Sequence, residues 1–509
     1  MKLKQIVAVT ASAVAACAAA SASAAYVDPL NIPPGAITIR MGGATAQDKG
    51  LALLMRRICS ANTMSVVSGS KQTAYLCLAN GTDTNVSPYF IAAGTPLVMY
   101  KNSVSGSGSG VVPVSNATAI PFLNLGSLTS AEYGNANTGT AGTKCTTTIT
   151  AGTVDFTDFA TYNCGAQIGV ASSAPDAGLS DVEPALLGWV SGTNGALTVT
   201  AGPQVIFGVP VSKNFRNALQ TAQGKASGSD AEADMPSLTK AQLAAMMTGG
   251  IINMANSLSD INGNKLVAPP GGAALTFCRR KAGSGTLAST KAYFTAEGCA
   301  ANVKGMTSGV DGDAVAPTLS SRVMEYGGTT GVLGCLNAAN TANKWAIGMA
   351  STETKPGFGY TADPVWGTDA GNWSFVKIQG YAPTSLNVAQ TKYDFLMEAT
   401  YQYRAAGNAF GPALAGSQKS FADLIIATNG NPLVMKELNT QFIQPFGQAG
   451  LLGKPGTPTA PSALPAGVLT QAEVTANPVN TWTRAAQGAP NSCQPAYIVT
   501  KETGLDMLQ

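Results

Sequence analysis

A short basic and glycine-rich segment, Arg279 to Thr286, carries residue types well suited to bind an anion; it reads RRKAGSGT. It follows an apolar run at 273–278 that we interpret as a strand, and it precedes 287–294, which can continue as a helix. Free backbone N–H groups, the positive end of the helix dipole, hydroxyl donors and a guanidinium would then meet at one point. This combination predicts a site for a small oxyanion. The alternative is an ordinary turn beside a basic surface pair.

Two further segments have the glycine-rich turns that could bring more donors to such a site. An alternating, strand-like run at 36–40 turns at Thr45 into a helix with apolar residues along one face of 51–58. A second strand-like run, 95–100, leads into the glycine- and serine-rich segment 105–111, which is either a ligand loop or a flexible linker. Thr45 is likewise either a ligand or a plain helix N-cap.

The composition excludes several classes of function. The chain contains no histidine, which excludes Ser-His-Asp and Cys-His catalysis and any zinc site that uses histidine. The cysteines lack CxxC spacing, so we expect no metal site. With 30 Lys and Arg against 27 Asp and Glu, no bulk charge draws the chain to nucleic acid or to a membrane surface. We therefore expect no enzyme, no cofactor and no nucleic-acid partner, and any recognition of an anion must be local.

The first 24 residues are typical of an export signal, with a charged start, an apolar stretch and the small-residue cleavage site Ala22-Ser23-Ala24. The sequence before Cys17 also resembles a lipoprotein signal, in which case Cys17 would be lipidated. No later segment is a long uncharged apolar span. We expect the mature chain not to span a membrane and to be periplasmic or extracellular.

The nine cysteines bear on this choice, because eight remain when Cys17 is removed with the signal. An even number in an exported protein predicts disulfides. Sequence proximity favours the pairs Cys59–Cys77, Cys145–Cys164 and Cys278–Cys299, with Cys335–Cys493 as the long-range remainder. Eight cysteines allow 105 pairings, so this is a preference among many.

The landmarks resemble, in their order along the chain, the periplasmic phosphate-binding proteins of ABC uptake systems, which belong to the type 2 periplasmic binding protein superfamily. That family has a strand–GAT–helix start, a glycine/serine loop after a strand ending in Tyr, a Ser-Asp turn, and an Arg-Arg-x-x-Gly-Ser-Gly-Thr segment. The matching segments here are Gly43–Thr45, Tyr100–Val111, Ser180–Asp181 and Arg279–Thr286. The resemblance implies an α/β fold with two lobes and a hinge.

The 509 residues exceed a single core, in agreement with two lobes. After the signal at 1–24, we expect lobe I to comprise 25–205 and 395–509, and lobe II to comprise 206–394. A region at about 112–178, rich in Thr, Gly, Ala and Asn, is interpreted as a β-rich insertion tied by a disulfide.

The resemblance also implies a set of ligand residues: Thr45, the amide of Ala46, Ser107, Asp181, Arg280, Ser284, Gly285 and Thr286. Ser109 is a second candidate in the glycine loop, and Asp176 is the alternative to Asp181. Arg279 should point away from the site, because side chains alternate along a strand. The family often has an acid two residues after the ligand arginine that helps to hold it, and here that position is Ala282.

The chemistry of this set favours phosphate or a similar tetrahedral oxyanion. Phosphate near neutral pH still carries a proton, which the carboxylate of Asp181 can accept in a hydrogen bond, whereas sulfate would be repelled. Asp181 could instead simply cap a turn. We expect a solute-binding protein, with an ABC permease as a possible partner. The alternatives are a secreted structural or adhesive protein that reuses the fold and, with least support, a hydrolase of phosphate esters.

Overall fold

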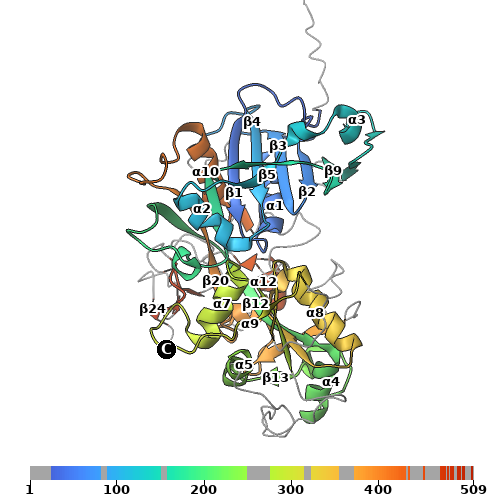
Figure 1. The fold of residues 1–509 in the computed structure, drawn as a ribbon, viewed down its shortest axis with the longest axis vertical. Coiled ribbons are helices and arrows are strands. Elements are labelled where there is room, and N and C mark those ends of the chain that lie inside the picture. The colour runs from blue at the N-terminus through green and yellow to red at the C-terminus, as the bar shows by residue number, and fades with distance from the viewer. Residues whose placement is uncertain are drawn as a thin grey trace, which may run out of the picture.

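The computed structural model describes most of the chain after the expected export signal. The described residues are 25–81, 89–150, 158–248, 275–314, 323–354 and 372–431, with the short pieces 434–435, 451–452, 470–476, 479–480, 482–485, 490–494, 496–498 and 506–507. The signal at 1–24, including Cys17, lies outside the described residues. Two lobes lie one above the other along the long axis of the molecule (Figure 1).

Lobe I is a mixed sheet with helices packed against it. Its elements are β1 (Ile37–Gly43), α1 (Asp48–Ile58), β2 (Ser65–Gly69), β3 (Gln72–Leu78), β4 (Pro96–Asn102), η1 (Gly106–Gly110), α2 (Val112–Ser115), β8 (Thr146–Thr150), β9 (Phe159–Gly165), β11 (Ala177–Ser180) and α10 (Gly416–Thr428). The strand order is β8-β9-β2-β3-β4-β1-β11, with β1 parallel to both β4 and β11. The carboxyl ends of these three strands therefore meet at one edge of the sheet.

The expected helix at the start of lobe I is confirmed as α1. Leu51, Leu54, Met55 and Ile58, at the spacing of one helical face, are all buried. They join the core of lobe I together with residues of β1 and α10. Burial of this apolar stripe places the turn between β1 and α1 at the edge of the sheet that faces lobe II (Figure 1).

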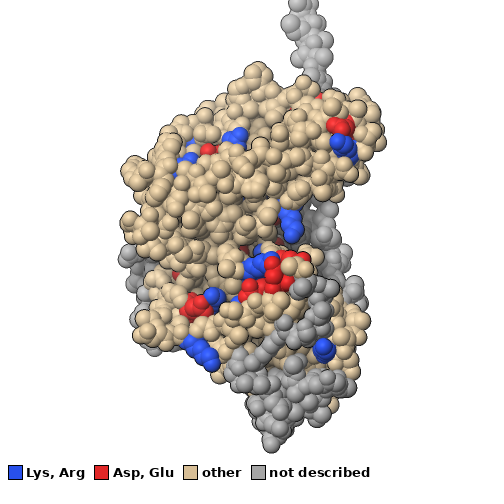
Figure 2. All heavy atoms as spheres, viewed as in Figure 1, with Lys and Arg blue, Asp and Glu red and all other residues tan. Residues whose placement is uncertain are grey.

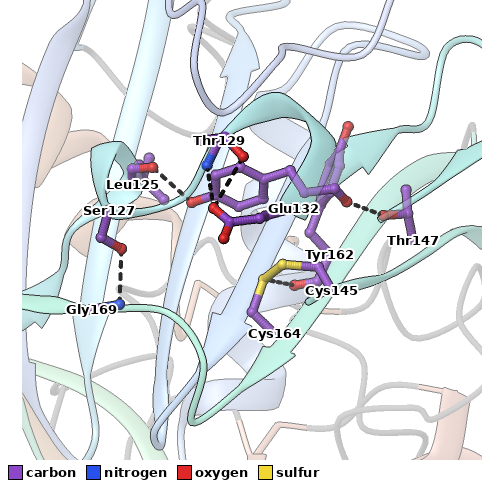
Figure 3. Close-up of a disulfide and its surroundings, with 10 residues drawn as sticks. Leu125, Ser127, Thr129, Glu132, Cys145, Thr147, Tyr162, Cys164 and Gly169 are labelled. Carbon is purple, nitrogen blue, oxygen red and sulfur yellow. Dashed lines mark hydrogen bonds between the residues drawn. A yellow bond between two sulfur atoms is a disulfide. The ribbon is translucent and has the colours of Figure 1, made fainter. Parts of the chain in front are cut away.

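The β-rich insertion tied by a disulfide is also confirmed. It contains β5 (Ile120–Leu123), η2 (Leu125–Ser127), α3 (Ser130–Tyr133), β6 (Gly134–Asn135), β7 (Thr140–Ala141), β8, β9 and β10 (Val170–Ser173). Figure 3 shows Cys145 bonded to Cys164, with Tyr162 nearby. The ring of Tyr162 packs edge to face on that of Tyr133. The side chain of Glu132 accepts from the backbone of Thr129 and closes a capping box. Because β9 pairs with β2, the insertion extends the sheet of lobe I.

Lobe II has its own sheet. Its elements are β12 (Leu197–Ser212), α4 (Lys213–Ala222), η4 (Glu232–Asp234), β13 (Ser237–Leu238), α5 (Lys240–Met247), β14 (Thr276–Arg280), α7 (Gly285–Thr290), η5 (Lys291–Thr295), β15 (Val310–Asp311), β16 (Val323–Tyr326), α8 (Thr329–Thr341), β17 (Ala346–Gly348), β18 (Ala350–Ser351), η6 (Thr352–Thr354), β19 (Trp373–Ile378) and α9 (Ser385–Ala389). The order is β13-β19-β12-β17-β14-β16-β15, with β14 parallel to β16 and β17.

Two long strands connect the lobes. Residues 197–206 of β12 pair with β20 (Leu396–Arg404), which also pairs with β11 of lobe I, whereas 207–212 pair with β17, β18 and β19 of lobe II. The pairing register between β12 and β20 shifts between Ala201 and Gln204. One strand thus belongs to both sheets, and the expected two-lobed α/β fold is confirmed, with β12 and β20 as the connection between the lobes.

Several short elements lie outside the two sheets or at their margins. They are η3 (Pro184–Leu187), β21 (Leu451–Leu452), α12 (Gln471–Ala476), β22 (Trp482–Thr483), β23 (Tyr497–Ile498) and β24 (Asp506–Met507). The strand β21 pairs with β12. In the described part of the chain, no helix combines the length and the apolar character needed to cross a membrane.

All eight cysteines after Cys17 form disulfides, but two of the four expected pairs are wrong. The bonds are Cys59–Cys77, Cys145–Cys164, Cys278–Cys335 and Cys299–Cys493. Cys278 lies on β14, and the helix α8 that packs on this strand brings Cys335 to it. Cys299 instead bonds the C-terminal segment, so sequence proximity is overruled by the packing of a helix on a parallel sheet.

Candidate functional site

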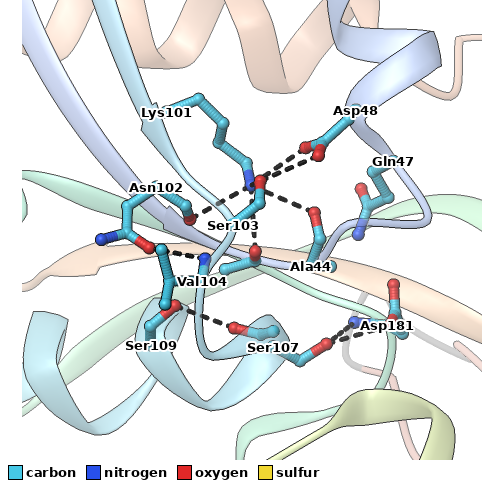
Figure 4. A network of polar contacts seen from close by, with 12 residues as sticks. Ala44, Gln47, Asp48, Lys101, Asn102, Ser103, Val104, Ser107, Ser109 and Asp181 are labelled. Carbon is cyan, nitrogen blue, oxygen red and sulfur yellow. Dashed lines mark hydrogen bonds and ion pairs between the residues drawn. The ribbon is translucent and has the colours of Figure 1, made fainter. Parts of the chain in front are cut away.

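The candidate site lies where loops of both lobes meet. Lobe I contributes the turns after β1, β4 and β11, and lobe II contributes the turns after β14 and β16. The lobe I strands β1, β4 and β11 are mutually parallel, as are β14 and β16 of lobe II, so each lobe presents the carboxyl ends of neighbouring strands at one edge. In open α/β sheets, ligands bind at such edges. Figure 4 shows the lobe I side of the site.

Ser107 and Asp181, which lie 74 residues apart in the sequence, are hydrogen bonded in the structure. The Ser107 hydroxyl donates to Asp181 Oδ2 at 3.0 Å and accepts from the Asp181 backbone N–H at 3.1 Å. In this contact the Asp181 carboxylate accepts from a hydroxyl group. The alternative interpretation, in which Asp181 caps a turn, required it to accept from a backbone amide. Both residues are buried. The hydroxyl proton of Ser107 is directed to Asp181, so Ser107 orients the carboxylate.

Lobe II lies directly against this pair. A Cβ atom added at Gly285 would fall 2.3 Å from Ser107 Oγ and 2.7 Å from Asp181 Oδ2. The backbone N–H of Gly108 donates to the carbonyl of Gly283 at 2.7 Å. The structure thus brings the RRKAGSGT segment onto the glycine loop of lobe I, and glycine at 285 permits the close approach.

Arg280 is the cation of the site. Its side chain is 3% exposed, Nη2 donates to the carbonyl of Gly327 at 2.8 Å, and Nη1 donates to Thr329 Oγ1 at 3.1 Å. These two contacts hold the guanidinium. The acidic residue that the family resemblance implies two positions after this arginine is absent, since that position is Ala282. Nη2 also approaches Gly106, at 3.3 Å from the position of a Cβ on that residue. Burial lowers the pKa of Arg280 below its usual value, while the charge of Asp181 opposes this shift.

Arg279 points to the opposite face of β14, as predicted from strand alternation. Its Nε donates to Glu325 Oε1 at 3.2 Å, and Nη2 forms an ion pair with the same oxygen. In the register of β14 with β16, Arg279 lies beside Glu325 and Arg280 lies beside Tyr326. The two adjacent arginines therefore have separate environments, and Arg280 is the one at the lobe interface.

Four buried polar atoms in this region have no hydrogen-bond partner among the described residues. They are Gln47 Oε1, Asp181 Oδ1, Arg280 Nε and Ser284 Oγ. Each parent side chain is at most 3% exposed. Ser284 is the N-cap residue of α7, yet its hydroxyl makes no capping bond. Because a buried polar group without a partner is costly, a cluster of them containing both donors and acceptors indicates a place for a polar ligand.

The carboxyl group of Asp181 has unusual electrostatics. Burial raises its pKa from 3.8 to about 6, and the hydrogen bond from Ser107 and the charges of Arg280 and Lys101 limit this increase. At neutral pH the group is therefore still mostly ionised. A carboxylate in such surroundings can accept a hydrogen bond from a protonated oxyanion and repels one that carries no proton.

Two residues that the sequence did not single out support the lobe I turn (Figure 4). Lys101 is 2% exposed, and its Nζ donates to the carbonyls of Gly43 at 2.9 Å and Ala44 at 3.1 Å and pairs with Asp48 at 3.1 Å. Gln47, fully buried, donates through Nε2 to the carbonyl of Ser180 at 2.9 Å. The position of Lys101 near the end of an apolar strand could have identified it as a buried lysine. The local sequence pattern gives no indication that Gln47 is buried.

The remaining predicted residues fall in different places. Thr45 is not the N-cap of α1, which is Gln47, and it lines a cleft between the lobes. Ala46 belongs to the lobe I turn after β1 and packs against the apolar core of lobe II. The buried residue Thr286 accepts from two hydroxyls through its carbonyl. The structure does not bring the two alternative candidates into the site. Ser109 donates to the carbonyl of Gly106, and Asp176 accepts from the backbone N–H of Arg40.

The cleft lined by Thr45 has a volume of about 530 Å³. Lobe I contributes Ser103 and the β2–β3 turn, and lobe II contributes residues 327–330. Figure 2 shows that charged side chains are sparse on the visible face and that several gather where the lobes meet. Among the described residues, no group of three or more Cys, Asp or Glu could hold a metal ion.

The comparisons with known proteins place the chain beside three solved structures. A substrate-binding protein with bound phosphate from Clostridium perfringens is 14% identical, with 82% of this chain and 99% of that chain covered and a TM-score of 0.37. An ABC-type phosphate transport receptor from Vibrio cholerae is 14% identical, with 52% and 79% covered and a TM-score of 0.29. PstS from Borrelia burgdorferi is 10% identical, with 82% and 98% covered and a TM-score of 0.34.

No protein-family model matches the sequence, and the search of curated proteins returns no relative. The TM-scores are below 0.5 and the identities are 14% or less. The ligand of the site is therefore inferred from the geometry of this chain.

Proposed function

We propose that this chain is an exported solute-binding protein that holds phosphate, or a similar tetrahedral oxyanion, between its two lobes, and that it is not an enzyme. The observation that carries the proposal is the cluster of buried polar atoms without partners around Arg280, Ser284 and Asp181. A guanidinium and a hydroxyl are donors that suit the oxygens of an anion.

The ligand set would draw on both lobes. Arg280 and Ser284 would donate from lobe II, with the backbone of Gly285 and Thr286 beside them. Thr45, the amide of Ala46 and the loop that carries Ser107 would face them from lobe I. An anion held by both lobes stabilises their closed arrangement, because it contributes contacts to each of them.

Asp181 would supply the selectivity. A mostly ionised carboxylate accepts a hydrogen bond from the hydroxyl of hydrogen phosphate and repels sulfate, so discrimination comes from rejection of the unprotonated anion. Arsenate, which has the same shape and also carries a proton near neutral pH, should bind as phosphate does.

The four disulfides support a location in an oxidising compartment, which for an exported chain is the periplasm or the cell exterior. In the periplasm, an ABC permease would be the partner that accepts the anion from the cleft. The apolar start of the chain at 1–24 would act as the export signal.

Isothermal titration calorimetry with phosphate, arsenate and sulfate at pH 7.5 tests the proposal. We expect saturable heat with phosphate and arsenate, little with sulfate, and a loss of phosphate affinity of at least about 100-fold in Arg280→Gln. The matched control is Arg279→Gln, whose side chain points to Glu325. If none of the three anions binds, the proposal is overturned and a structural or adhesive role is favoured. Release of phosphate from an ester substrate would instead indicate a hydrolase.

A further inference from the structure

A second cavity, the insertion cavity, is lined only by residues of lobe I. Its walls come from the segment before β1, from β1 and β4 of the sheet, and from β5, η2 and β10 of the insertion. Its volume is about 460 Å³, and volumes of about 300–1,000 Å³ are typical of sites for organic molecules. Of the residues assigned to the proposed oxyanion site, none lines this cavity. A ligand here would therefore occupy a separate site.

Arg40 is the charged residue of the insertion cavity. In the parallel register of β1 with β4 it lies beside Tyr100, and its guanidinium carbon is 5.5 Å from the centre of that ring. Both residues line the cavity. No hydrogen bond or ion pair joins this guanidinium to another described residue. A stack on a ring uses the flat face of a guanidinium and leaves the N–H groups at its edge for another partner.

The charge of Arg40 also acts on Asp176, but that carboxylate is held by the backbone. Its Oδ2 accepts from the backbone N–H of Arg40 at 2.8 Å. Burial raises the pKa of Asp176, and the charges of Arg40 and Arg404 oppose this shift. Asp176 does not line the insertion cavity, and neither does any other Asp or Glu among the described residues. The cavity therefore contains one cation and no carboxylate to neutralise it.

The rest of the wall is largely apolar. Leu30 and Ile32 contribute to it from the segment before β1, and Phe122 contributes to it from β5. Its polar side chains, those of one Asn and two Ser residues, carry no charge. An aliphatic or aromatic ligand body would remove such apolar surface from water, which stabilises binding by about 25 cal/mol per Å². A small inorganic anion has no surface that matches these side chains.

From these observations we propose that the insertion cavity binds an organic carboxylate with an apolar body, with the carboxylate paired to Arg40 and the body against the apolar wall. A carboxylate fits the planar edge of a guanidinium through two parallel hydrogen bonds. An amine is repelled by the same charge, and a neutral chain leaves the N–H groups without a charged acceptor. The site adds a second ligand to this chain and does not depend on the proposed oxyanion site.

Isothermal titration calorimetry with sodium octanoate at pH 7.5, below the concentration at which it forms micelles, tests the inference. We expect one octanoate to bind per chain. Its affinity should exceed by about 10-fold or more that of acetate, which lacks the apolar body, and that of octylamine, which carries the opposite charge. Saturation of the protein with phosphate should leave the octanoate affinity unchanged, because different residues hold the two ligands.

Two variants separate the charge from the space. Arg40→Met removes the cation and keeps a long side chain, and we expect octanoate affinity to fall about 10-fold or more with phosphate affinity unchanged. The matched control is Arg56→Met in α1, whose guanidinium lies over the ring of Phe159 at 4.7 Å and does not line the cavity. Ala171→Phe fills the cavity from an exposed position of β10, so it should block octanoate without disturbing the core. Circular dichroism checks that each variant is folded.

Several results would overturn the inference. Octanoate that does not bind, or that binds no better than octylamine, would show that Arg40 does not select a carboxylate. Displacement of octanoate by phosphate would place it in the oxyanion site instead. Unchanged octanoate affinity in folded Ala171→Phe would exclude the insertion cavity, even if Arg40→Met did not fold. Failure of phosphate to bind would reject the proposed function and leave this inference in place.

Discussion

Ser107 of lobe I and Gly285 of lobe II lie so close together that no side chain fits at position 285. A Cβ atom there would fall 2.3 Å from Ser107 Oγ, and the next nearest atom is Asp181 Oδ2 at 2.7 Å. Real Cβ atoms essentially never approach other heavy atoms so closely, and Asp181 limits the freedom of the Ser107 hydroxyl. The arrangement of the two lobes thus depends on the absence of a side chain at one position.

The variant Gly285→Ala should therefore hold the lobes apart. The added methyl group conflicts with Ser107 and Asp181, and an overpacked contact costs about 1–3 kcal/mol. We expect phosphate affinity, measured by calorimetry, to fall roughly 10-fold or more, and small-angle X-ray scattering to report a larger radius of gyration.

The matched control is Gly334→Ala in α8, where a Cβ meets open space and alanine should stabilise the helix by about 0.5–1 kcal/mol. Unchanged anion affinity in Gly285→Ala would contradict the assigned position of the site.

The stability of the protein should depend on the ionisation of Asp181. Because burial raises the folded-state pKa to about 6 from 3.8, the folded state binds this proton more tightly than the unfolded state. Stability is therefore greatest below pH 4 for this group, and it falls as the pH rises through the folded-state pKa. The difference corresponds to about 3 kcal/mol at most.

Urea unfolding at pH 4.5 and pH 7.5 measures this effect in the ligand-free protein. We expect Asp181→Asn to be more stable than the wild type at pH 7.5 and to lose most of this advantage at pH 4.5. The same variant should bind sulfate with an affinity closer to that for phosphate, since the repelling charge is gone. A constant difference in stability across this pH range would contradict the raised pKa.

The buried lysine behind the first turn of lobe I should be essential for the shape of that turn. Lys101 donates to the carbonyls of Gly43 and Ala44, so Lys101→Met would leave buried acceptors without a donor. We expect a loss of about 2–4 kcal/mol in the free energy of unfolding, and weaker anion binding, because Thr45 follows directly. Lys144→Met, at an exposed ion pair with Glu132, is the control and should change neither quantity measurably. Wild-type stability in Lys101→Met would show that the turn holds its shape without the lysine.

The sequence predicted those parts of the site that depend on local order. The strand before Arg280 and the alternation that separates it from Arg279 follow from the periodicity of β14 alone. The pairs Cys59–Cys77 and Cys145–Cys164 join residues fewer than 20 positions apart, and proximity was sufficient to predict them.

What the sequence could not provide depends on how distant elements pack. The acceptors that hold Arg280 come from the end of β16 and the start of α8, at positions set by the parallel register of two strands. Burial of Gln47 depends on the closeness of β11, 133 residues away. Local patterns contain neither the register nor the lobe contact, so these partners could not be predicted.

The disulfide pattern provides a test of the fold that is independent of any ligand. Peptide mapping of the unreduced protein should yield the pairs Cys278–Cys335 and Cys299–Cys493 and no Cys278–Cys299 peptide. Only the packing of α8 on β14 brings Cys335 to Cys278, because 57 residues separate them. The second bond spans 194 residues, and loop closure predicts that a bond over such a span stabilises the fold by up to about 5 kcal/mol. A double serine variant at 299 and 493 should therefore unfold at a lower urea concentration than the wild type. Recovery of a Cys278–Cys299 peptide would mean that α8 does not pack on β14 as described, and the acceptors that hold Arg280 would be misplaced with it.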